Sequence, residues 1–418
     1  MRFLGYSILV AALTVALVLA ARAGEDAWTA KSYWLHMTST PTSDEMITTE
    51  AARRSYVVLN AWESDLAAKF KAANPKIRTF VYKDLSSTRG HACTAGVDDS
   101  ALPTGVGYCA ADLSWFLLDP DGKRFEYDGY EGHWQMDVGN TDYQNAWADN
   151  VIASSKGSFD GVFMDNALFA CDTYHEGVCP AAYPTDESMR EAYRSMFANT
   201  RQKFVDAGLK TVANMSNARL HEGAWGSYVE NLDGGFDEWW LTFNDNDLLA
   251  EYPEGWSRQV AEIAANEAKG KITWVQPHHS GAEQPFRYAY ASYLLAAGSN
   301  AAISEIEETD RYGNPSQWRA EYDWDLGAPA GTYFAVASNV FQRDFACGTV
   351  IVNANKTGSS AVTVRLSSSH VDEKGSRVRS VSLPGTAGAV LRKTCQGRRG
   401  ELPGDAPDQR HAASARAR

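Results

Sequence analysis

Signatures of several common enzyme classes are missing from this chain of 418 residues. It has no Gly-rich phosphate loop, no Gly-x-Ser-x-Gly turn and no His-Glu-x-x-His motif, which argues against nucleotide-binding, esterase and metalloprotease functions. No two cysteines have the CxxC spacing and no two histidines have helical ligand spacing, so we expect no metal and no cofactor. Positive charge is also scarce: 39 Lys and Arg against 52 Asp and Glu give a net charge of −13. Because that charge repels polyanions, we expect no nucleic-acid partner.

Long apolar runs are confined to the N-terminus. An apolar stretch at residues 6–19 follows Arg2 and precedes Ala21-Arg22-Ala23, the pattern of a secretory signal and its cleavage site. We therefore expect residues 1–23 to be a signal peptide and the protein to be secreted or periplasmic. No later segment approaches the roughly 20 apolar residues that a membrane-spanning helix needs, so no membrane span is expected.

Cysteine is sparse but even in number, which favours disulfides in a chain sent to an oxidising compartment. Six cysteines allow 15 connectivities, and the sequence does not choose among them. Pairing sequence neighbours would keep each bridge within one local unit. It gives Cys93–Cys109, Cys171–Cys179 and Cys347–Cys395.

Eight short runs rich in β-branched and aromatic residues occur before residue 310, with helical patterns between several of them. The runs lie at 33–37, 56–62, 77–82, 161–165, 210–214, 235–238, 272–276 and 301–306. Strands this apolar are typical of parallel strands buried on both faces. The alternation predicts an α/β fold, a (β/α)8 TIM barrel over residues 24–328, with a doubly wound open sheet as the alternative.

Two segments depart from the barrel repeat. Residues 83–160 are too long for one connection between strands, and we expect them to lie over the barrel mouth and help form a substrate cleft. After residue 329 the pattern changes to short alternating strands separated by Gly, Ser and Asn turns, which predicts a small C-terminal all-β sandwich over 329–396. Residues 397–418 are of low complexity and are expected to be a disordered tail.

Two carboxylates stand where predicted strands end. Asp165 closes the apolar run of the fourth strand, and Glu238 closes that of the sixth. The carboxyl ends of barrel strands form the floor of the active site, and glycosidic hydrolysis needs two carboxyl groups flanking the scissile bond. Since neighbouring strand residues face opposite ways, only one of Asp237 and Glu238 should reach the cleft, and we favour Glu238. Either carboxylate could instead cap a following helix.

Aromatic and amide side chains at predicted strand ends suit a sugar ligand. Flat rings bury the apolar C–H faces of sugars, while amide and imidazole groups bind hydroxyls. Most of the 13 tryptophans must still belong to the core. The residues that we expect to bind substrate are Trp62, Tyr82, Asn166, Asn214, Trp239, Gln276 and His278.

The segments FDGVFMDN, YDGY…HWQMDVGN…YQNAWADNVI and GGFDEWW resemble bacterial glycoside hydrolases grouped as hypothetical glycosyl hydrolase families, over most of residues 30–310. These families look like relatives of the (β/α)8-barrel α-glycosidase superfamily. The resemblance implies an Asp nucleophile on the fourth strand, at Asp165, and an acid–base catalyst carried over to Glu238. It also implies retention of configuration, and a supporting role for the C-terminal β domain.

Together these features predict a secreted glycoside hydrolase that acts on an oligo- or polysaccharide. Two alternatives use the same surface. A carbohydrate-binding protein on a catalytically silent barrel would need only the aromatic residues, and a transglycosylase would differ only in its acceptor.

Overall fold

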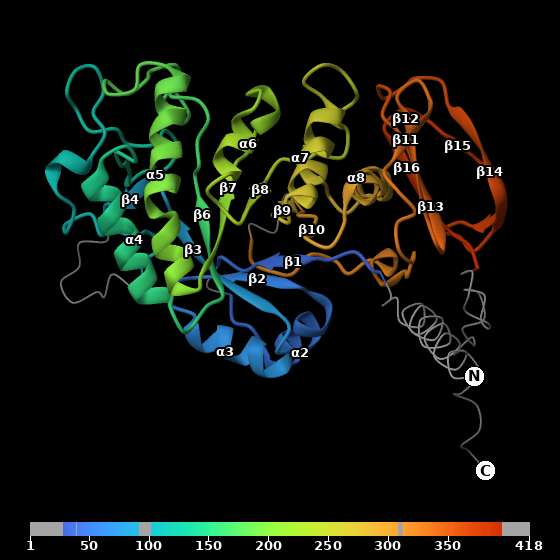
Figure 1. Cartoon of the computed structure of the whole chain (residues 1–418), viewed down its shortest axis with the longest axis horizontal. Helices are drawn as coiled ribbons and strands as arrows, with labels where there is room; N and C mark the ends of the chain where they lie inside the picture. The colour runs from blue at the N-terminus through green and yellow to red at the C-terminus, as the bar shows by residue number, and fades with distance from the viewer. Residues whose placement is uncertain (1–27, 39, 92–101, 308–311, 395–418) are drawn as a thin grey trace, which may run out of the picture.

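Eight parallel strands, paired in chain order, form the centre of the molecule (Figure 1). The computed structural model describes residues 28–38, 40–91, 102–307 and 312–394. The strands are β1 (Tyr33–Leu35), β2 (Tyr56–Leu59), β3 (Arg78–Asp84), β6 (Gly161–Asp165), β7 (Lys210–Asn214), β8 (Gly234–Asp237), β9 (Ile272–Val275) and β10 (Ala301–Ile303). A parallel bridge between Ser32 and Ile303 joins the last strand to the first. The expected TIM-type fold is confirmed, with every strand within a few residues of its predicted range.

Helices cover the outside of this cylinder. They are α2 (Asp44–Arg53), α3 (Ser64–Ala73), α4 (Thr141–Ser155), α5 (Asp186–Ala207), α6 (Ala224–Val229), α7 (Trp256–Ala268) and α8 (Glu283–Ala296). In Figure 1, α2 and α3 lie below the strands, α6 and α7 lie above them, and α5 runs along the side of β6. Their buried faces and the outward-facing strand residues make up two large apolar clusters. The apolar patterns of the helices and of the strands therefore both reflect packing between these two kinds of element.

The inside of the barrel is filled mainly by aromatic rings. Trp274 of β9 is fully buried, and its ring centroid lies 5.4 Å from Tyr33, 5.1 Å from Tyr56 and 4.9 Å from Phe80. The first residue of β6 is Gly161, and a side chain does not fit there because its Cβ would lie 2.4 Å from a Phe80 ring carbon. This packed interior closes the barrel beneath its carboxyl-end rim, so a ligand at that rim must bind above these rings.

The long connection between β3 and β6 folds over that rim. It contains a two-stranded antiparallel sheet, β4 (Ser87–Arg89) with β5 (His133–Gln135), in which Arg89 pairs with His133. A short 3-10 helix at Leu113–Trp115 precedes β5, and α4 returns the chain to the barrel. Cys109 is disulfide-bonded, and its predicted partner Cys93 lies outside the described residues.

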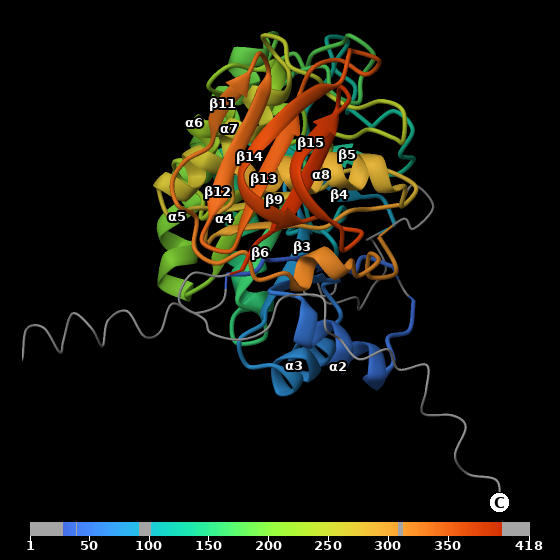
Figure 2. The same cartoon turned by 90° about the vertical axis from the view of Figure 1, so that its right-hand side faces the viewer.

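Six antiparallel strands follow the barrel, in the order β11-β12-β13-β16-β14-β15. They are β11 (Phe334–Ala337), β12 (Val340–Phe345), β13 (Gly348–Asn353), β14 (Val362–Val371), β15 (Arg377–Leu383) and β16 (Ala387–Arg392). Alternation divides β13 between two cores: Val350 faces the cluster that includes α8, and Ile351 faces a small cluster shared with β14 and β15. Figure 2 shows these strands in front of α8. The expected C-terminal all-β unit is therefore present, packed directly on the barrel.

Of the expected disulfides, Cys171–Cys179 is present, with the two Cα atoms 4.9 Å apart. Cys347 is also disulfide-bonded, and its predicted partner Cys395 lies outside the described residues. The predicted signal peptide and tail lie outside them too. In the part of the chain that the structure describes, no helix is both long and apolar enough to cross a membrane.

Candidate active site

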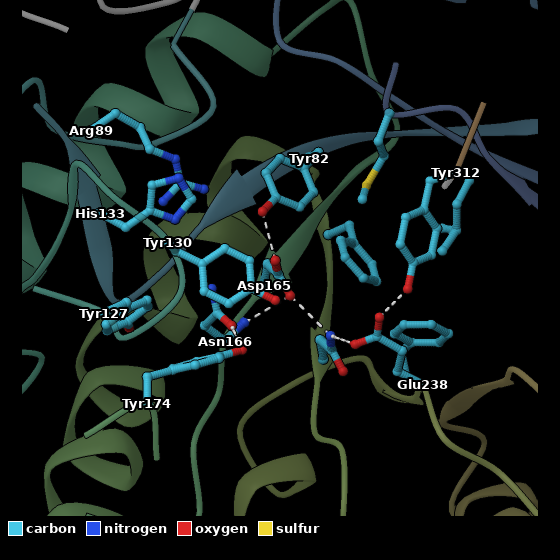
Figure 3. A pocket seen from close by; sticks show the side chains of 15 residues that line it. Tyr82, Arg89, Tyr127, Tyr130, His133, Asp165, Asn166, Tyr174, Glu238 and Tyr312 are labelled. Carbon is cyan, nitrogen blue, oxygen red and sulfur yellow. Dashed lines mark hydrogen bonds between the residues drawn. The ribbon is translucent and has the colours of Figure 1, made fainter. Parts of the chain in front are cut away.

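A pocket of about 200 Å³ opens at the carboxyl end of the barrel (Figure 3). Its floor carries Asp165 at the end of β6, Asn214 at the end of β7 and Glu238 directly after β8. These three neighbouring strands deliver polar groups to one rim because their carboxyl ends point the same way. The two predicted carboxylates therefore share one cavity.

Asn214 lies between the two carboxylates. Its Nδ2 donates to Asp165 Oδ1 at 2.9 Å and to Glu238 Oε2 at 2.8 Å. The two acceptor oxygens can lie no further apart than these two distances combined. A single amide therefore fixes the spacing of the acidic pair.

Two tyrosines hold the outer oxygens of the pair. The Tyr82 hydroxyl, from β3, donates to Asp165 Oδ2 at 2.6 Å, and the Tyr312 hydroxyl donates to Glu238 Oε1. Sequence reasoning found Tyr82 at its strand end but missed Tyr312, which lies in irregular structure beyond β10 and gives no strand-end signal. Both carboxylates are thus oriented from two sides.

The ionisation of Asp165 is shifted by its surroundings. Burial raises the pKa of this carboxyl to about 6, and the negative charges of Asp84 and Glu238 act in the same direction. Hydrogen bonds from Tyr82 and Asn214 oppose the rise because they favour the charged form. Asp165 is therefore ionised above roughly pH 6 and protonated below it.

Asn166 adopts a left-handed backbone, with φ of 62°, immediately after the strand. Asn tolerates this conformation better than most residues, and here it turns the Asn166 N–H back onto Asp165 Oδ1 at 3.0 Å. The Asn166 side chain donates to Asp84 and accepts from the Tyr174 hydroxyl at 3.1 Å. Tyr174 also has a positive φ, 67°, and lines the pocket. The turn after β6 thereby builds one wall of the site.

The β3–β6 connection supplies another wall. Arg89, Tyr127, Tyr130 and His133 all come from it and line the pocket. Tyr130 stacks on the His133 ring with the centroids 5.5 Å apart. Burial lowers the pKa of His133 to about 4, so its imidazole is neutral near pH 7. Only the unusual length of this connection pointed to these residues.

Four predicted substrate-binding residues lie outside the lining of this pocket: Trp62, Trp239, Gln276 and His278. Trp62 and Trp239 are 52% and 38% exposed, whereas Gln276 is buried. The His278 ring stacks on Trp239 at 3.6 Å, and its Nε2 lies 2.7 Å from the backbone oxygen of Glu238. His278 thus supports the backbone that carries Glu238, and a direct contact of these four with substrate stays a prediction.

Asp237 faces away from the pocket, as strand alternation predicts. It is fully buried and accepts a hydrogen bond from Gln259 of α7 at 2.8 Å. Its Oδ1 and the buried Oε2 of Glu262, also on α7, have no other partner. A proton shared between the two carboxyls would satisfy both oxygens. Gln259 also donates to the Trp239 carbonyl at 2.9 Å, so it ties the turn leading to Glu238 to α7.

This pair should make stability depend on pH. Burial raises the pKa of Asp237 from 3.8 to about 7 and raises that of Glu262, so folding retains protons that the unfolded chain releases above about pH 4. The contribution is complete below about pH 4 and is lost as the pH rises through about 7. In Glu262→Gln, the amide donates to Asp237 without a titrating proton.

Urea unfolding should therefore show a shallower pH dependence in Glu262→Gln. Between about pH 5 and pH 8 we expect its free energy of unfolding to fall by roughly 1–3 kcal/mol less than that of the wild type. Equal slopes in the two proteins would contradict a shared proton.

A second buried ionic cluster lies beside the rim. Glu305 pairs with Arg319 at 2.7 Å and lies 2.9 Å from His279 Nε2. Arg319 donates to both oxygens of Glu305, at 2.7 Å and 3.1 Å. Among the residues that the structure describes, no group of three or more His, Cys, Asp or Glu side chains is arranged to hold a metal ion.

The sequence model of hypothetical glycosyl hydrolase family 15 matches residues 71–349, more than half of the chain. The chain belongs to this family. The match runs from α3 through every later strand of the barrel and into β13. Membership confirms the glycoside hydrolase class expected from the sequence, with a carbohydrate as substrate.

Solved structures give more distant likenesses. The glycoside hydrolase domain of PelA from Pseudomonas aeruginosa is 16% identical, with 66% of this chain and 94% of that domain covered and a TM-score of 0.42. The cyclic α-maltosyl-(1→6)-maltose hydrolase from Arthrobacter globiformis is 14% identical, with 86% and 93% covered and a TM-score of 0.43. Both are too distant to indicate a substrate for this chain. No curated protein matches it.

Proposed function

We propose that the chain is a retaining glycoside hydrolase with Asp165 as nucleophile and Glu238 as acid–base catalyst. The observation that carries this proposal is the shared Asn214 amide, whose bonds of 2.9 Å and 2.8 Å limit the spacing of the two carboxylates. Retaining enzymes keep their carboxyl groups roughly 5–5.5 Å apart, whereas inverting enzymes need roughly 6.5–9.5 Å to admit water. The close spacing supports retention.

The surroundings of Asp165 favour a nucleophile. Its two oxygens accept hydrogen bonds from the Tyr82 hydroxyl, the Asn214 amide and the Asn166 N–H. These donors stabilise the charged carboxylate and aim it into the pocket. With a pKa of about 6, Asp165 is charged at neutral pH and still basic enough to attack.

The proposed reaction has two displacements. Asp165 attacks the anomeric carbon, the bond to the glycosidic oxygen breaks, and Glu238 gives its proton to that leaving oxygen. Glu238 then takes a proton from water, whose oxygen attacks the same carbon and releases Asp165. Each displacement inverts the configuration at the anomeric carbon, so after two displacements the product has the configuration of the substrate.

The walls of the pocket suit a sugar in this geometry. Tyr130 and Tyr174 offer flat rings with hydroxyl edges, and Arg89 and His133, from the same wall as Tyr130, offer N–H groups. Exposed Trp62 and Trp239 are proposed to contact further sugar units of an oligo- or polysaccharide. The predicted signal sequence and the Cys171–Cys179 disulfide support action outside the cytoplasm.

A glycan panel tests this proposal. The purified protein is incubated with oligo- and polysaccharides of varied sugar and linkage, and new reducing ends are measured beside binding of the same glycans. Hydrolysis of at least one glycan is the expected result. Binding without any new reducing end would contradict hydrolysis and favour a carbohydrate-binding protein, and products longer than the substrate would favour a transglycosylase.

A further inference from the structure

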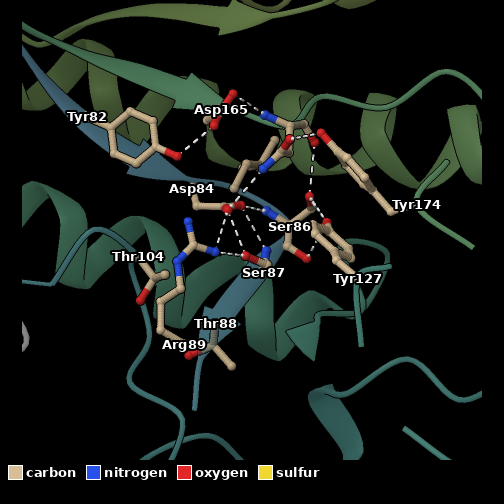
Figure 4. Close-up of polar contacts among 12 residues, drawn as sticks. Tyr82, Asp84, Ser86, Ser87, Thr88, Arg89, Thr104, Tyr127, Asp165 and Tyr174 are labelled. Atoms are coloured by element: carbon tan, nitrogen blue, oxygen red, sulfur yellow. Dashed lines mark hydrogen bonds and ion pairs between the residues drawn. The ribbon is translucent and has the colours of Figure 1, made fainter. Parts of the chain in front are cut away.

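A third carboxylate, Asp84, lies at the end of β3 beside Asp165 (Figure 4). In the parallel register of β3 and β6, Asp84 is the direct partner of Asp165. It is fully buried and is absent from the lining of the pocket. Asp84 therefore cannot touch a bound sugar, and any role in the reaction must pass through other residues.

Five hydrogen bonds converge on the two oxygens of Asp84. Oδ1 accepts from the backbone N–H groups of Ser86 at 3.0 Å and Ser87 at 2.9 Å. Oδ2 accepts from the Ser87 hydroxyl at 2.6 Å, from Arg89 Nη1 at 3.0 Å and from the Asn166 amide at 3.0 Å. A neutral carboxyl could not accept all of them, so this geometry is built for the charged form.

These bonds connect two parts of the site. Ser87 and Arg89 belong to β4, which starts the wall made by the β3–β6 connection. Asn166 gives its N–H to Asp165 and its side-chain oxygen to the Tyr174 hydroxyl. Asp84 thus joins the turn after β3 to the turn after β6, one strand away from the proposed nucleophile.

We propose that Asp84 is a positioning residue for Asp165, because its carboxylate fixes Asn166 and places a buried negative charge beside its strand neighbour. The consequence for catalysis rests on the proposed function, whereas the effect on Asp165 itself does not. The Coulomb repulsion from Asp84 is, after burial, the largest contribution that raises the pKa of Asp165. Arg89, paired with Asp84, offsets part of that charge.

Other titratable groups also act on Asp165 and must stay unchanged in a test. These groups are Tyr82 on β3, Tyr174 after β6, Tyr193 on α5, Glu238 after β8 and Tyr312 after β10.

The test is a carboxyl titration of the folded protein. Aspartate carboxyl carbons are labelled with ¹³C, and the Asp165 signal is assigned by its loss in Asp165→Asn. In Asp84→Asn we expect the Asp165 midpoint to fall by about one pH unit from its starting value near 6. Arg89→Gln should shift it upward, because it removes a positive charge that acts on Asp165 directly and also offsets the charge of Asp84.

Asp160→Asn is the matched control. Asp160 precedes the same strand at its other end, where it pairs with Lys71, and its loss should leave the Asp165 midpoint unchanged. If Asp84→Asn does not fold because Arg89 is left without its partner, the double variant Asp84→Asn/Arg89→Gln takes its place, and its Asp165 midpoint should lie below that of Arg89→Gln alone. An Asp165 midpoint that does not fall in Asp84→Asn, or in the double variant relative to Arg89→Gln, would overturn the proposal.

Activity measurements distinguish the positioning role of Asp84 from the proposed hydrolase function. In Asp84→Asn the acid limb of the kcat/KM profile should move to lower pH together with the NMR midpoint, while kcat at its plateau falls because Asn166 loses its anchor. A shifted midpoint in a wild-type protein that hydrolyses no glycan would support the role of Asp84 and contradict the proposed function. A shifted midpoint with an unmoved acid limb in an active enzyme would contradict Asp165 as the group that must be charged.

Discussion

Asp165→Asn should abolish hydrolysis while leaving sugar binding close to that of the wild type. The amide occupies the same space and still accepts the Tyr82 hydroxyl through its oxygen, but it cannot form a glycosyl ester. Loss of a catalytic group of this kind typically costs about 10³-fold or more in kcat. The measurement is kcat on the best glycan of the panel, beside the Kd of the same glycan by calorimetry.

Asp160→Asn provides the control for this variant as well. It removes a carboxylate from the other end of the β6 segment, where Asp160 accepts from the Thr79 N–H at 2.8 Å. We expect its kcat to match the wild type. A substantial kcat in Asp165→Asn, or an equal loss in both variants, would remove Asp165 from the role of nucleophile.

Glu238→Gln should lose activity to an extent that depends on the leaving group. A glutamine still accepts the Tyr312 hydroxyl but has no proton to give the leaving oxygen. We expect a fall of about 10²–10⁴-fold with a natural glycan. With an activated aryl glycoside the first step needs no acid, so the glycosyl-enzyme should form at nearly the wild-type rate.

Azide distinguishes formation of the glycosyl-enzyme from its breakdown in this variant. A small anionic nucleophile needs no general base, so added azide should restore turnover of the aryl glycoside and yield a glycosyl azide of retained configuration. Asp160→Asn is again the control, because Asp160 pairs with Lys71 at the other end of β6, whereas Asp237 helps to hold the turn that carries Glu238. Equal losses with natural and activated substrates, without azide rescue, would exclude Glu238 as the acid–base group.

The barrel and the acidic pair were accessible from sequence because both depend on periodic patterns. Short apolar runs fixed the eight strands, and the last polar residue of a run marks the rim of a parallel barrel. This logic found Asp165, Asn214 and Tyr82, which the structure brings together in one pocket. Alternation by two also separated Glu238 from Asp237.

The remaining walls of the pocket depend on contacts between distant segments. Tyr312 and Tyr174 come from irregular loops, and Arg89 meets His133 only because β4 pairs with β5 across more than forty residues. No local pattern encodes such pairings. Trp239 and His278 stand at strand ends as expected, but their rings stack on each other instead of lining the pocket.

In the proposed reaction Asp165 forms a covalent bond to the sugar while Glu238 assists from across the pocket. A 2-deoxy-2-fluoro glycoside of the sugar found by the panel, carrying an activated leaving group, slows release of such an intermediate more than its formation. After proteolysis, mass spectrometry should locate one glycosyl group on the peptide that contains Asp165. A label on any other carboxylate would exclude Asp165 as the nucleophile. An unlabelled enzyme that hydrolyses the parent glycoside with inversion would exclude a covalent intermediate.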